Sequence, residues 1–553
     1  MRRLGFFGCL GVALSTACVF GAVSMQAQMT DERLRALLQE ADAAVLAQPP
    51  AAQTEDAGEV TVPMSLDEAV TLALERNLDI AVQRLNPQLQ DIAIAGARAF
   101  YNPILTSTLS QAENNNAPTS QLQVSQGGGG VRNETFTYNG GLLQNMPWGG
   151  QFQATLNNSR QVTTSNNAFY NPSFQSVWTA LYEQPLLRDF RVDNQRRQLQ
   201  ISRTNREISD VQLRASITNT VSNVRNAYWD YVFATQAVEV AQQSLDLATK
   251  LVEDNQTRVE VGTMAPIDVV QAQAEQATRR QALVTAESNR QTAELALKRL
   301  IVAGTSDPNW RARLDPVDRP ESEFEPVDVE AAIARALESR TDLEIARKNL
   351  SNNALTLSYL RNQTLPALDL QVNYGVQGVG GPYQVRSNTG VLGSDVTEII
   401  PGGLADALNS VFHNNHPRWT VGLNLSYPIG TSTQDASLAR ARVQLSQVEA
   451  QLRQIELQIA TEVTNASIQL RNAAEAVQAA AAAQELSIRR LEAEQSKFEV
   501  GMSTNYFVVQ AQRDLNDARN SELRALLNYR KALVEFERLQ QTALQSQNIT
   551  ILQ

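Results

Sequence analysis

The spacing of apolar residues along this chain alternates between two periods, and it does so twice in the same order. Apolar positions at helical spacing run from Ser65 to about Ala99, and again from near Pro326 to Leu365. Ser65 and Glu68 carry the signature of a capping box at the start of the first of these helices. Apolar and polar residues then alternate as in strands, and a very long helical pattern and a shorter one follow.

Short matching motifs indicate that the two halves are copies of one unit. The motif RVEVG, which ends at Gly262, reappears as KFEVG, which ends at Gly501. The sequence VVQAQ occurs unchanged at 269–273 and at 508–512. Repetition on this scale means that the chain builds one structural unit twice.

We divide the chain where these patterns change. The parts are a signal peptide (1–27), a flexible N-terminal extension (28–62), a first repeat (63–302), an inter-repeat linker (303–325), a second repeat (326–543) and a C-terminal tail (544–553). Within the repeats, strands are expected in 104–184 and 367–428, and long helical hairpins in 188–302 and 432–543.

The expected strands have the length and the aromatic residues of a transmembrane β-barrel. Trp178, Tyr182, Trp419 and Tyr427 lie near the ends of strands of about ten residues. A soluble β-domain with an aromatic core is the alternative. Residues 135–158 predict an extra hairpin in the first copy, which either joins the barrel wall or caps its external mouth.

The run from Gly375 to Pro417 is rich in Asn, Ser, Thr and Gly, so we expect a loop there. It contains His413 and His416, the two histidines of the chain. No carboxylate or thiol cluster adjoins them in the sequence, so a metal site is not predicted.

The long helical segments carry apolar residues at every seventh position. In the first copy these are Ile217, Val224, Tyr231, Val238, Leu245, Val252 and Val259, with Ala227, Ala234, Ala241 and Ala248 three positions after four of them. In the second copy they are Val463, Leu470, Val477, Leu491 and Phe498. This narrow stripe predicts long helices that pair in a left-handed supercoil.

Each long helix ends at a Val-Gly pair that predicts a reversal of the chain. Gly262 and Gly501 suit the left-handed position after a helix C-terminus, and Pro266 suits the first turn of the next helix. The sequence therefore predicts two antiparallel helical hairpins, each with its tip far from the strands.

Composition narrows the class of protein. The first residues read as an export signal that contains both cysteines, Cys9 and Cys18; a second interpretation makes Cys18 a lipidation site. No later segment is apolar for long enough to predict a transmembrane helix. The 58 acidic residues exceed the 47 basic ones, which argues against a nucleic-acid partner.

Two strand pairs per chain are too few to close a barrel, because about eight strands is the natural minimum. We therefore expect an oligomer. A homotrimer would give a twelve-strand barrel continued by a twelve-helix tunnel, or an eighteen-strand barrel if the hairpin 135–158 joins the wall.

The duplicated order of strands, long helix, Val-Gly turn and VVQAQ resembles the outer-membrane efflux (TolC) family, as do SLDEAVTLALERN and YEQPLLRDF. The resemblance implies a trimeric channel in the outer membrane of a Gram-negative-type bacterium, in contact with outer-membrane lipid and extending into the periplasm. Its expected partners are a periplasmic adaptor (membrane fusion) protein and an inner-membrane pump. The sequence has no Gly-x-Ser-x-Gly, His-Glu-x-x-His or dinucleotide-binding motif, so we expect neither an enzyme activity nor a cofactor. A coiled-coil stalk or adhesin is the alternative function.

The same resemblance implies that the hairpin tips constrict the tunnel and bind the adaptor. The expected constriction residues are Asp268, which matches a family aspartate, and Phe507 and Gln510 at the second tip, where the sequence departs from the acidic residues of the family. An apolar constriction at Phe507 would close the pore by excluding water. The expected docking residues are Val261, Gly262, Pro266, Val500, Gly501 and Ser503. Two of these have simpler interpretations. Asp268 suits the positive end of a helix dipole, and Phe507 suits packing between hairpins.

Overall fold

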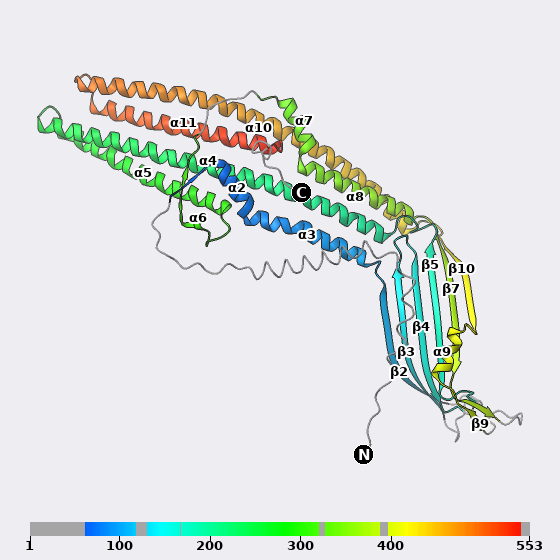
Figure 1. The fold of residues 1–553 in the computed structure, drawn as a ribbon. Coiled ribbons are helices and arrows are strands. Elements are labelled where there is room, and N and C mark those ends of the chain that lie inside the picture. The colour runs from blue at the N-terminus through cyan, green and yellow to red at the C-terminus, as the bar shows by residue number, and fades with distance from the viewer. Residues whose placement is uncertain (1–60, 118–129, 166, 320–326, 387–395, 543–553) are drawn as a thin grey trace, which may run out of the picture. The chain divides into compact units, whose positions relative to one another are not determined.

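The structure, a computed structural model, describes residues 61–117, 130–165, 167–319, 327–386 and 396–542. The chain folds into two compact units, whose helices and strands are labelled in Figure 1. One unit contains the described residues up to Ile92, Ile208–Ile345 and the described residues from Arg453 onward; the other contains Ala93–Glu207 and Ala346–Leu452.

The first unit is largely helical. It contains α2 (Leu66–Arg76), α5 (Pro266–Ile301), α6 (Pro308–Arg311), α7 (Val329–Ser339), α11 (Asn505–Leu539), and parts of α3 (Leu78–Ala99), α4 (Asn194–Glu260), α8 (Thr341–Gln363) and α10 (Thr433–Glu499). Helices α4 and α10 have 67 residues each. Each is therefore ~100 Å long at 1.5 Å per residue.

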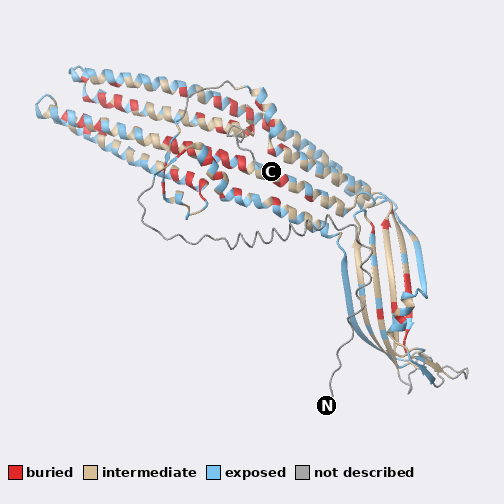
Figure 2. Cartoon of the chain, viewed as in Figure 1, coloured by how far each residue is buried: buried red, intermediate tan, exposed pale blue. Residues whose placement is uncertain are grey.

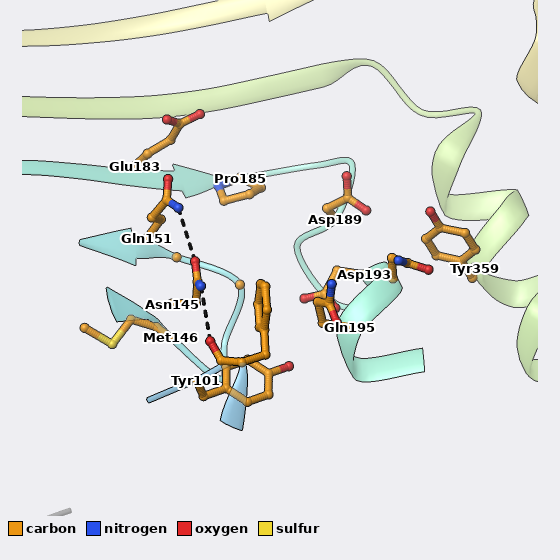
Figure 3. A pocket seen from close by; sticks show the side chains of 14 residues that line it. Tyr101, Asn145, Met146, Gln151, Glu183, Pro185, Asp189, Asp193, Gln195 and Tyr359 are labelled. Atoms are coloured by element: carbon orange, nitrogen blue, oxygen red, sulfur yellow. Dashed lines mark hydrogen bonds between the residues drawn. The ribbon is translucent and has the colours of Figure 1, made fainter. Parts of the chain in front are cut away.

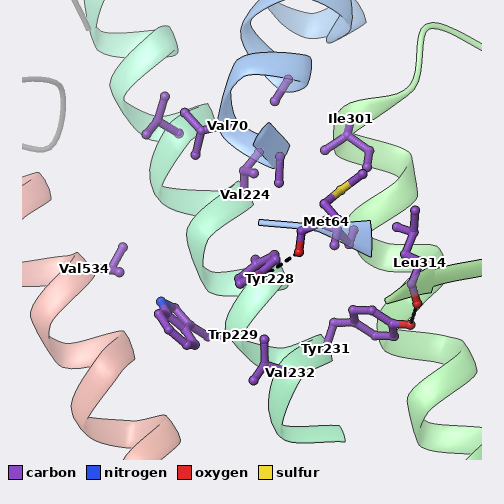
Figure 4. Packing of buried hydrophobic residues seen from close by; sticks show 14 of the residues in the cluster. Met64, Val70, Val224, Tyr228, Trp229, Tyr231, Val232, Ile301, Leu314 and Val534 are labelled. Atoms are coloured by element: carbon purple, nitrogen blue, oxygen red, sulfur yellow. Dashed lines mark hydrogen bonds between the residues drawn. The ribbon is translucent and has the colours of Figure 1, made fainter. Parts of the chain in front are cut away.

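A small parallel sheet lies against α4 in this unit. Strand β1 (Thr61–Met64) pairs with β6 (Arg313–Pro316). The Tyr228 hydroxyl donates to the Met64 carbonyl at 3.1 Å, and the Tyr231 hydroxyl donates to the Leu314 carbonyl (Figure 4). Four-residue strands are too short to show alternation, so the sequence did not reveal this sheet. Strand β1 begins in the last residues of the predicted N-terminal extension, and β6 lies within the predicted inter-repeat linker.

The heptad stripe is buried over much of its length. All five stripe residues of the second copy are buried, as are Ile217, Val224, Tyr231 and Val252 of the first copy. Val224 and Tyr231 belong to the main core, in which Val70, Ile301 and Val534 from three other helices pack together (Figure 4). The predicted pairing of long helices is confirmed at these positions.

The single helix expected from Ser65 to about Ala99 is wrong, because the chain breaks at Asn77 into α2 and α3. The Asn77 side-chain oxygen accepts the N–H groups of Asp79 at 2.9 Å and Ile80 at 3.1 Å. A short polar side chain that bonds to the following backbone favours a helix start over a helix interior. The second copy breaks likewise at Arg340, between α7 and α8.

The second unit is built on one antiparallel sheet. Its strands, in spatial order, are β10 (Pro417–Ser426), β7 (Ala367–Gly380), β5 (Ser173–Pro185), β4 (Gln151–Thr163), β3 (Val131–Asn145) and β2 (Ile104–Asn116). The predicted hairpin 135–158 is thus β3 and β4, which lie inside the sheet. The sheet has six strands, so the expectation of two strand pairs per chain is corrected.

The two faces of this sheet differ in chemistry. Register places large apolar residues on one face of every strand: Leu105, Leu109, Leu142, Phe152, Leu156, Trp178, Tyr182, Leu370, Val372, Trp419, Val421 and Leu423. The opposite face carries mainly Thr, Ser, Asn and Gln, such as Thr106, Thr137, Asn157, Thr179 and Asn373. We refer to these as the apolar face and the polar face.

Among the described residues, β2 pairs only with β3 and β10 only with β7, so each of these edge strands has one unpaired edge. Every residue of β2 is exposed, and so is every residue of β10 except Gly422 (Figure 2). On the apolar face, Leu105 at one edge is 81% exposed and Leu425 at the other is 70% exposed. Open strand edges with exposed apolar side chains are a template for pairing with another chain.

The expected loop from Gly375 to Pro417 is largely wrong. Strand β7 continues to Gly380, and the region then forms the hairpin of β8 (Tyr383–Arg386) and β9 (Val396–Ile400) and the helix α9 (Leu404–Phe412). The prediction failed because glycines are typical of loops, whereas Gly378 and Gly380 lie in a strand that packs against α9.

Among the described residues, no helix is both apolar and long enough to cross a membrane. The predicted signal peptide, Cys18, the N-terminal extension up to residue 60 and the C-terminal tail lie outside the described residues.

We predict that Asn77→Ala destabilises the first unit by about 1 kcal/mol or more, because it removes the N-terminal cap of α3. It also removes the bond from the Asn77 amide to the Leu300 carbonyl, at 2.9 Å. Thermal unfolding followed by circular dichroism should show a lower Tm. Asn86→Ala on the same helix is the control, since Asn86 bonds to Gln83 one turn away. Equal shifts for both variants would contradict the capping role.

Candidate functional site

Both helical hairpins turn through the same backbone motif. At the first tip the N–H of Thr263 donates to the Arg258 carbonyl at 2.9 Å, and at the second the N–H of Met502 donates to the Lys497 carbonyl at 2.8 Å. Gly262 (φ 81°) and Gly501 (φ 77°) occupy the left-handed position that this motif requires. The predicted chain reversals at both glycines are confirmed.

The tips expose apolar side chains. Val261 is 68% exposed, Val500 71% and Met502 79%. Pro266 is the first residue of α5, as its position predicted. Single exposed apolar residues are ordinary, but a group of them at the end of a hairpin favours contact with another protein.

Behind the tips, the two hairpins share an apolar cluster. Leu251 and Val252 of α4, Ala272 of α5, Phe498 of α10, and Val508 and Val509 of α11 pack together. The Arg258 guanidinium lies 4.5 Å from the centre of the Phe498 ring, a cation–π contact between the hairpins.

A buried amide pair joins the hairpins beside this cluster. Asn255 of α4 and Asn505 of α11 are 0% and 2% exposed. The Asn255 amide donates to the Asn505 side-chain oxygen at 2.9 Å, and the Asn505 amide donates to the Asp268 carbonyl at 3.3 Å. Because buried polar groups are costly when unpaired, these bonds fix the alignment of α4, α5 and α11.

About two turns further from the tip than Asp268, a buried carboxylate joins α5 to α11. The Glu275 side chain is 2% exposed and forms ion pairs with both Arg513 and Arg279. Arg513 donates to Oε2 at 2.9 and 2.5 Å, and Arg279 donates to Oε1 at 2.8 and 2.7 Å. We call this group the Glu275 cluster.

The Glu275 cluster shifts the pKa of its carboxylate. Burial alone raises the pKa of Glu275, but the hydrogen bonds and charges of Arg513 and Arg279 outweigh it and hold the pKa below its usual value. The group is therefore ionised at neutral pH and bound by two cations.

The three predicted constriction residues are not joined to one another. Asp268 lies in the first turn of α5, partly exposed. Phe507 is 52% exposed and makes an edge contact with Tyr506, at 5.5 Å between ring centres. The Gln510 amide donates to Asp514 at 2.8 Å within the same helix. Phe507 is outside the apolar cluster between the hairpins, which argues against its packing interpretation.

Ser503, a predicted docking residue, bonds to the hairpin on which it lies. Its hydroxyl donates to Glu494 at 2.9 Å, and Glu494 also pairs with Lys497 at 2.7 Å.

The sequence analysis missed the Glu275 cluster and the Asn255–Asn505 pair, although both left a signal. Glu275 and Arg513 follow the two copies of VVQAQ closely and have opposite charges. Asn255 falls where the series Ala227, Ala234, Ala241 and Ala248 would place its next member. A polar residue in a buried series predicts a buried partner.

The sheet unit contains a pocket of about 340 Å³ where β3 and β5 end and β4 begins (Figure 3). The Asn145 amide donates to the Phe100 carbonyl, and the Gln151 amide donates to Asn145, both at 3.2 Å. In the part of the chain that the structure describes, no group of three or more His, Cys, Asp or Glu residues is arranged to hold a metal ion.

A sequence model of the outer membrane efflux protein family matches residues 143–302 and 332–540. These ranges cover more than half of the chain and include both hairpins. No match was found among curated proteins.

Solved structures of outer-membrane channels have the same fold. CusC is 14% identical, with a TM-score of 0.60 over 89% of this chain and 95% of its own. CmeC of Campylobacter jejuni is 14% identical, with a TM-score of 0.58 over 88% and 90%. MtrE of Neisseria gonorrhoeae is 16% identical, with a TM-score of 0.57 over 86% and 88%. At this identity the likeness establishes the fold alone.

We predict that Glu275→Gln loosens the two hairpins, because it removes the charge that binds two guanidinium groups. The expected loss in the free energy of unfolding is about 1.5–3 kcal/mol, since hydrogen bonds to charged groups contribute that much. Amide hydrogen exchange of residues 266–275 and 505–513 should accelerate about tenfold or more. Glu287→Gln, at an exposed position of the same helix, is the control and should leave exchange unchanged.

The same cluster predicts a pH dependence. A carboxylate whose folded pKa is depressed stabilises the fold above its unfolded pKa, and this stability is lost as the pH falls through the folded pKa. The protection of the tip amides, which is the exchange rate corrected for its intrinsic pH dependence, should therefore be steady near neutral pH and fall below the ordinary Glu pKa of 4.5. Glu275→Gln should lack this acid-induced loss of protection. An equal acid response in the variant and the native protein would exclude Glu275 as its origin.

Proposed function

Because this chain belongs to the outer membrane efflux protein family, we propose that it is a passive channel from the periplasm to the exterior, the outer-membrane component of a tripartite efflux or type I secretion system. It is an outer-membrane protein that extends into the periplasm. The family is one of channels rather than enzymes, and the proposed role requires no cofactor.

The observation that carries this proposal is the pair of unpaired sheet edges. Neighbouring strands are antiparallel throughout the order from β10 to β2, so β10 and β2 run in opposite directions. The β10 edge of one copy is therefore suited to antiparallel pairing with the β2 edge of the next. Closure removes the unpaired backbone groups that lipid does not tolerate.

Three copies, as the resemblance implies, would close an eighteen-strand barrel from three sheets of six. Even-numbered barrels of this size are natural, and they leave an aqueous channel. The apolar face would contact lipid, and the polar face would line the lumen. The two hairpins of each copy would supply a twelve-helix tunnel.

The hairpin tips are the proposed constriction and the proposed docking site. Exposed Val261, Val500 and Met502 favour a protein partner, which we propose is the periplasmic adaptor of an inner-membrane pump. Asp268 and Phe507 are the residues that we propose narrow the tunnel, the first by charge and the second by an apolar ring that expels water. The Glu275 cluster would hold the hairpins of one copy together.

Disulfide trapping tests the edge pairing. A cysteine at Thr108 in β2, scanned against cysteines at Thr420 and Asn424 in β10, should give a ladder of linked dimers and trimers. All these positions lie on the polar face. Cysteine at Thr155 in the central strand β4 is the control and should give no links between chains. Failure of every edge pair, in protein that is otherwise oligomeric, would contradict closure through β2 and β10.

Single-channel conductance in a planar bilayer tests the channel and its constriction. We expect discrete conductance with a preference for cations, and Asp268→Ala should reduce the cation-to-anion permeability ratio several-fold. Asp246→Ala, at an exposed position on α4, is the control. Unchanged selectivity would remove Asp268 from the constriction and favour Phe507. No conductance from confirmed trimers would favour the stalk.

A further inference from the structure

Helix α9 lies on the apolar face of the sheet, against β7 and β5. Two glycines of β7 allow this close approach. A Cβ atom on Gly378 would lie 1.9 Å from the Ala407 carbonyl oxygen, and one on Gly380 would lie 2.4 Å from that of Gly403. Ala407, on the side of α9 that faces the sheet, is fully buried. The sequence thus shapes this strand to receive the helix.

Helix α9 lies beyond the apolar band of the sheet, with its C-terminal end nearest that band. Trp178 and Tyr374 make an edge contact at 6.1 Å, and Trp419 lies opposite Tyr374 in the register. These aromatic residues form a row on the apolar face. From Ala367 to Tyr374 the strand rises ~24 Å at about 3.4 Å per residue, close to the ~25 Å apolar band of outer-membrane barrels.

Beyond this row the apolar face becomes polar, and α9 covers the change. Ser176 and Asn158 lie on this face, 0% and 7% exposed. The Ser176 hydroxyl donates to the Asn158 side-chain oxygen at 2.8 Å, and the Asn158 amide donates to the Tyr138 carbonyl at 3.3 Å. The helix packs on β5 and β7, so it lies over Ser176 and beside Asn158.

The two ends of α9 differ in their side chains, with an acid at one end and an aromatic residue at the other. Its first turn, with Gly403 and Asp406, lies near Gly380 at the far end of the strand. Its other end lies toward the aromatic row, because the Tyr374 hydroxyl donates to Asn414 just after the helix, at 2.8 Å. Phe412, in the last turn, is 73% exposed. The acidic end therefore points away from the apolar band and the aromatic end points toward it.

We propose that α9 is an interfacial helix that binds the lipid of the outer leaflet, with Phe412 inserted at the boundary between headgroups and acyl chains. This rests on the proposed function, which puts the apolar face of the sheet in the membrane. An amphipathic helix with an apolar residue toward the acyl chains and an acid toward water is suited to that depth. Three copies of α9 around the barrel would fix how deeply the barrel lies in the outer membrane.

Spin labelling tests this proposal in the full chain, reconstituted in vesicles of phosphatidylethanolamine and phosphatidylglycerol. Cys9→Ser and Cys18→Ser remove the native thiols, and Phe412→Cys, Ala405→Cys and Leu423→Cys each carry a nitroxide. Collision with oxygen reports lipid, and collision with a water-soluble nickel chelate reports water. Leu423, 63% exposed on the apolar face of β10, is the membrane reference.

We expect oxygen collisions to exceed nickel collisions at Leu423 and at Phe412, and the ratio to fall severalfold at Ala405 in the first turn. A water-exposed Phe412 beside a lipid-exposed Leu423 would overturn the role of α9 and leave the barrel intact. Water exposure at both positions would instead overturn the proposed function, because the apolar face would not be in the membrane.

Discussion

Peptide groups at the two edges of the large sheet impose the main physical constraint on this protein. In water an open edge invites aggregation, and in hydrocarbon each unpaired N–H or C=O is more costly still. Strands β2 and β10 carry such edges along with exposed apolar side chains, so neither environment suits the isolated chain. In the proposed assembly, pairing of these edges between copies satisfies the backbone groups and also brings the long helices of the copies together around one axis.

The duplicated unit has diverged in its strands in a way that respects this constraint. The first copy contributes four strands to the sheet and the second contributes two. The surplus is a hairpin, and a hairpin adds one strand in each direction. The edges therefore remain antiparallel to each other, which a single added strand would have prevented. The second copy instead contains α9, which packs on the sheet without adding a strand to it.

Local signals in the sequence predicted much of the fold. The Val-Gly turns, the heptad stripe and the capping box at Ser65 depend on nearby residues, and the structure contains all three. The break at Asn77 was missed because Asn is tolerated within a helical pattern and shows its capping role only in space. Helix α9 was missed because strand glycines that make room for it resemble loop glycines.

The candidate site was predicted less completely than the fold. The tips were located correctly because their turns depend on the backbone preferences of Gly and Pro, which can be recognised in the sequence. Glu275 and Arg513 are 238 positions apart, and their pairing depends on how two hairpins align. Phe507 follows the same logic: its neighbours Val508 and Val509 are buried, and only the helical phase decides that Phe507 is not.

The turn at each tip has a consequence for how this surface can change. Its shape comes from backbone hydrogen bonds and one left-handed glycine, and no atom outside the turn lies within 4 Å of where a Cβ would stand on either glycine. The exposed side chains beside the glycines, Val261, Val500 and Met502, therefore do not define the shape of the turn. Mutation at these positions can change the chemistry of the tip surface while the backbone hydrogen bonds and the glycines keep its geometry.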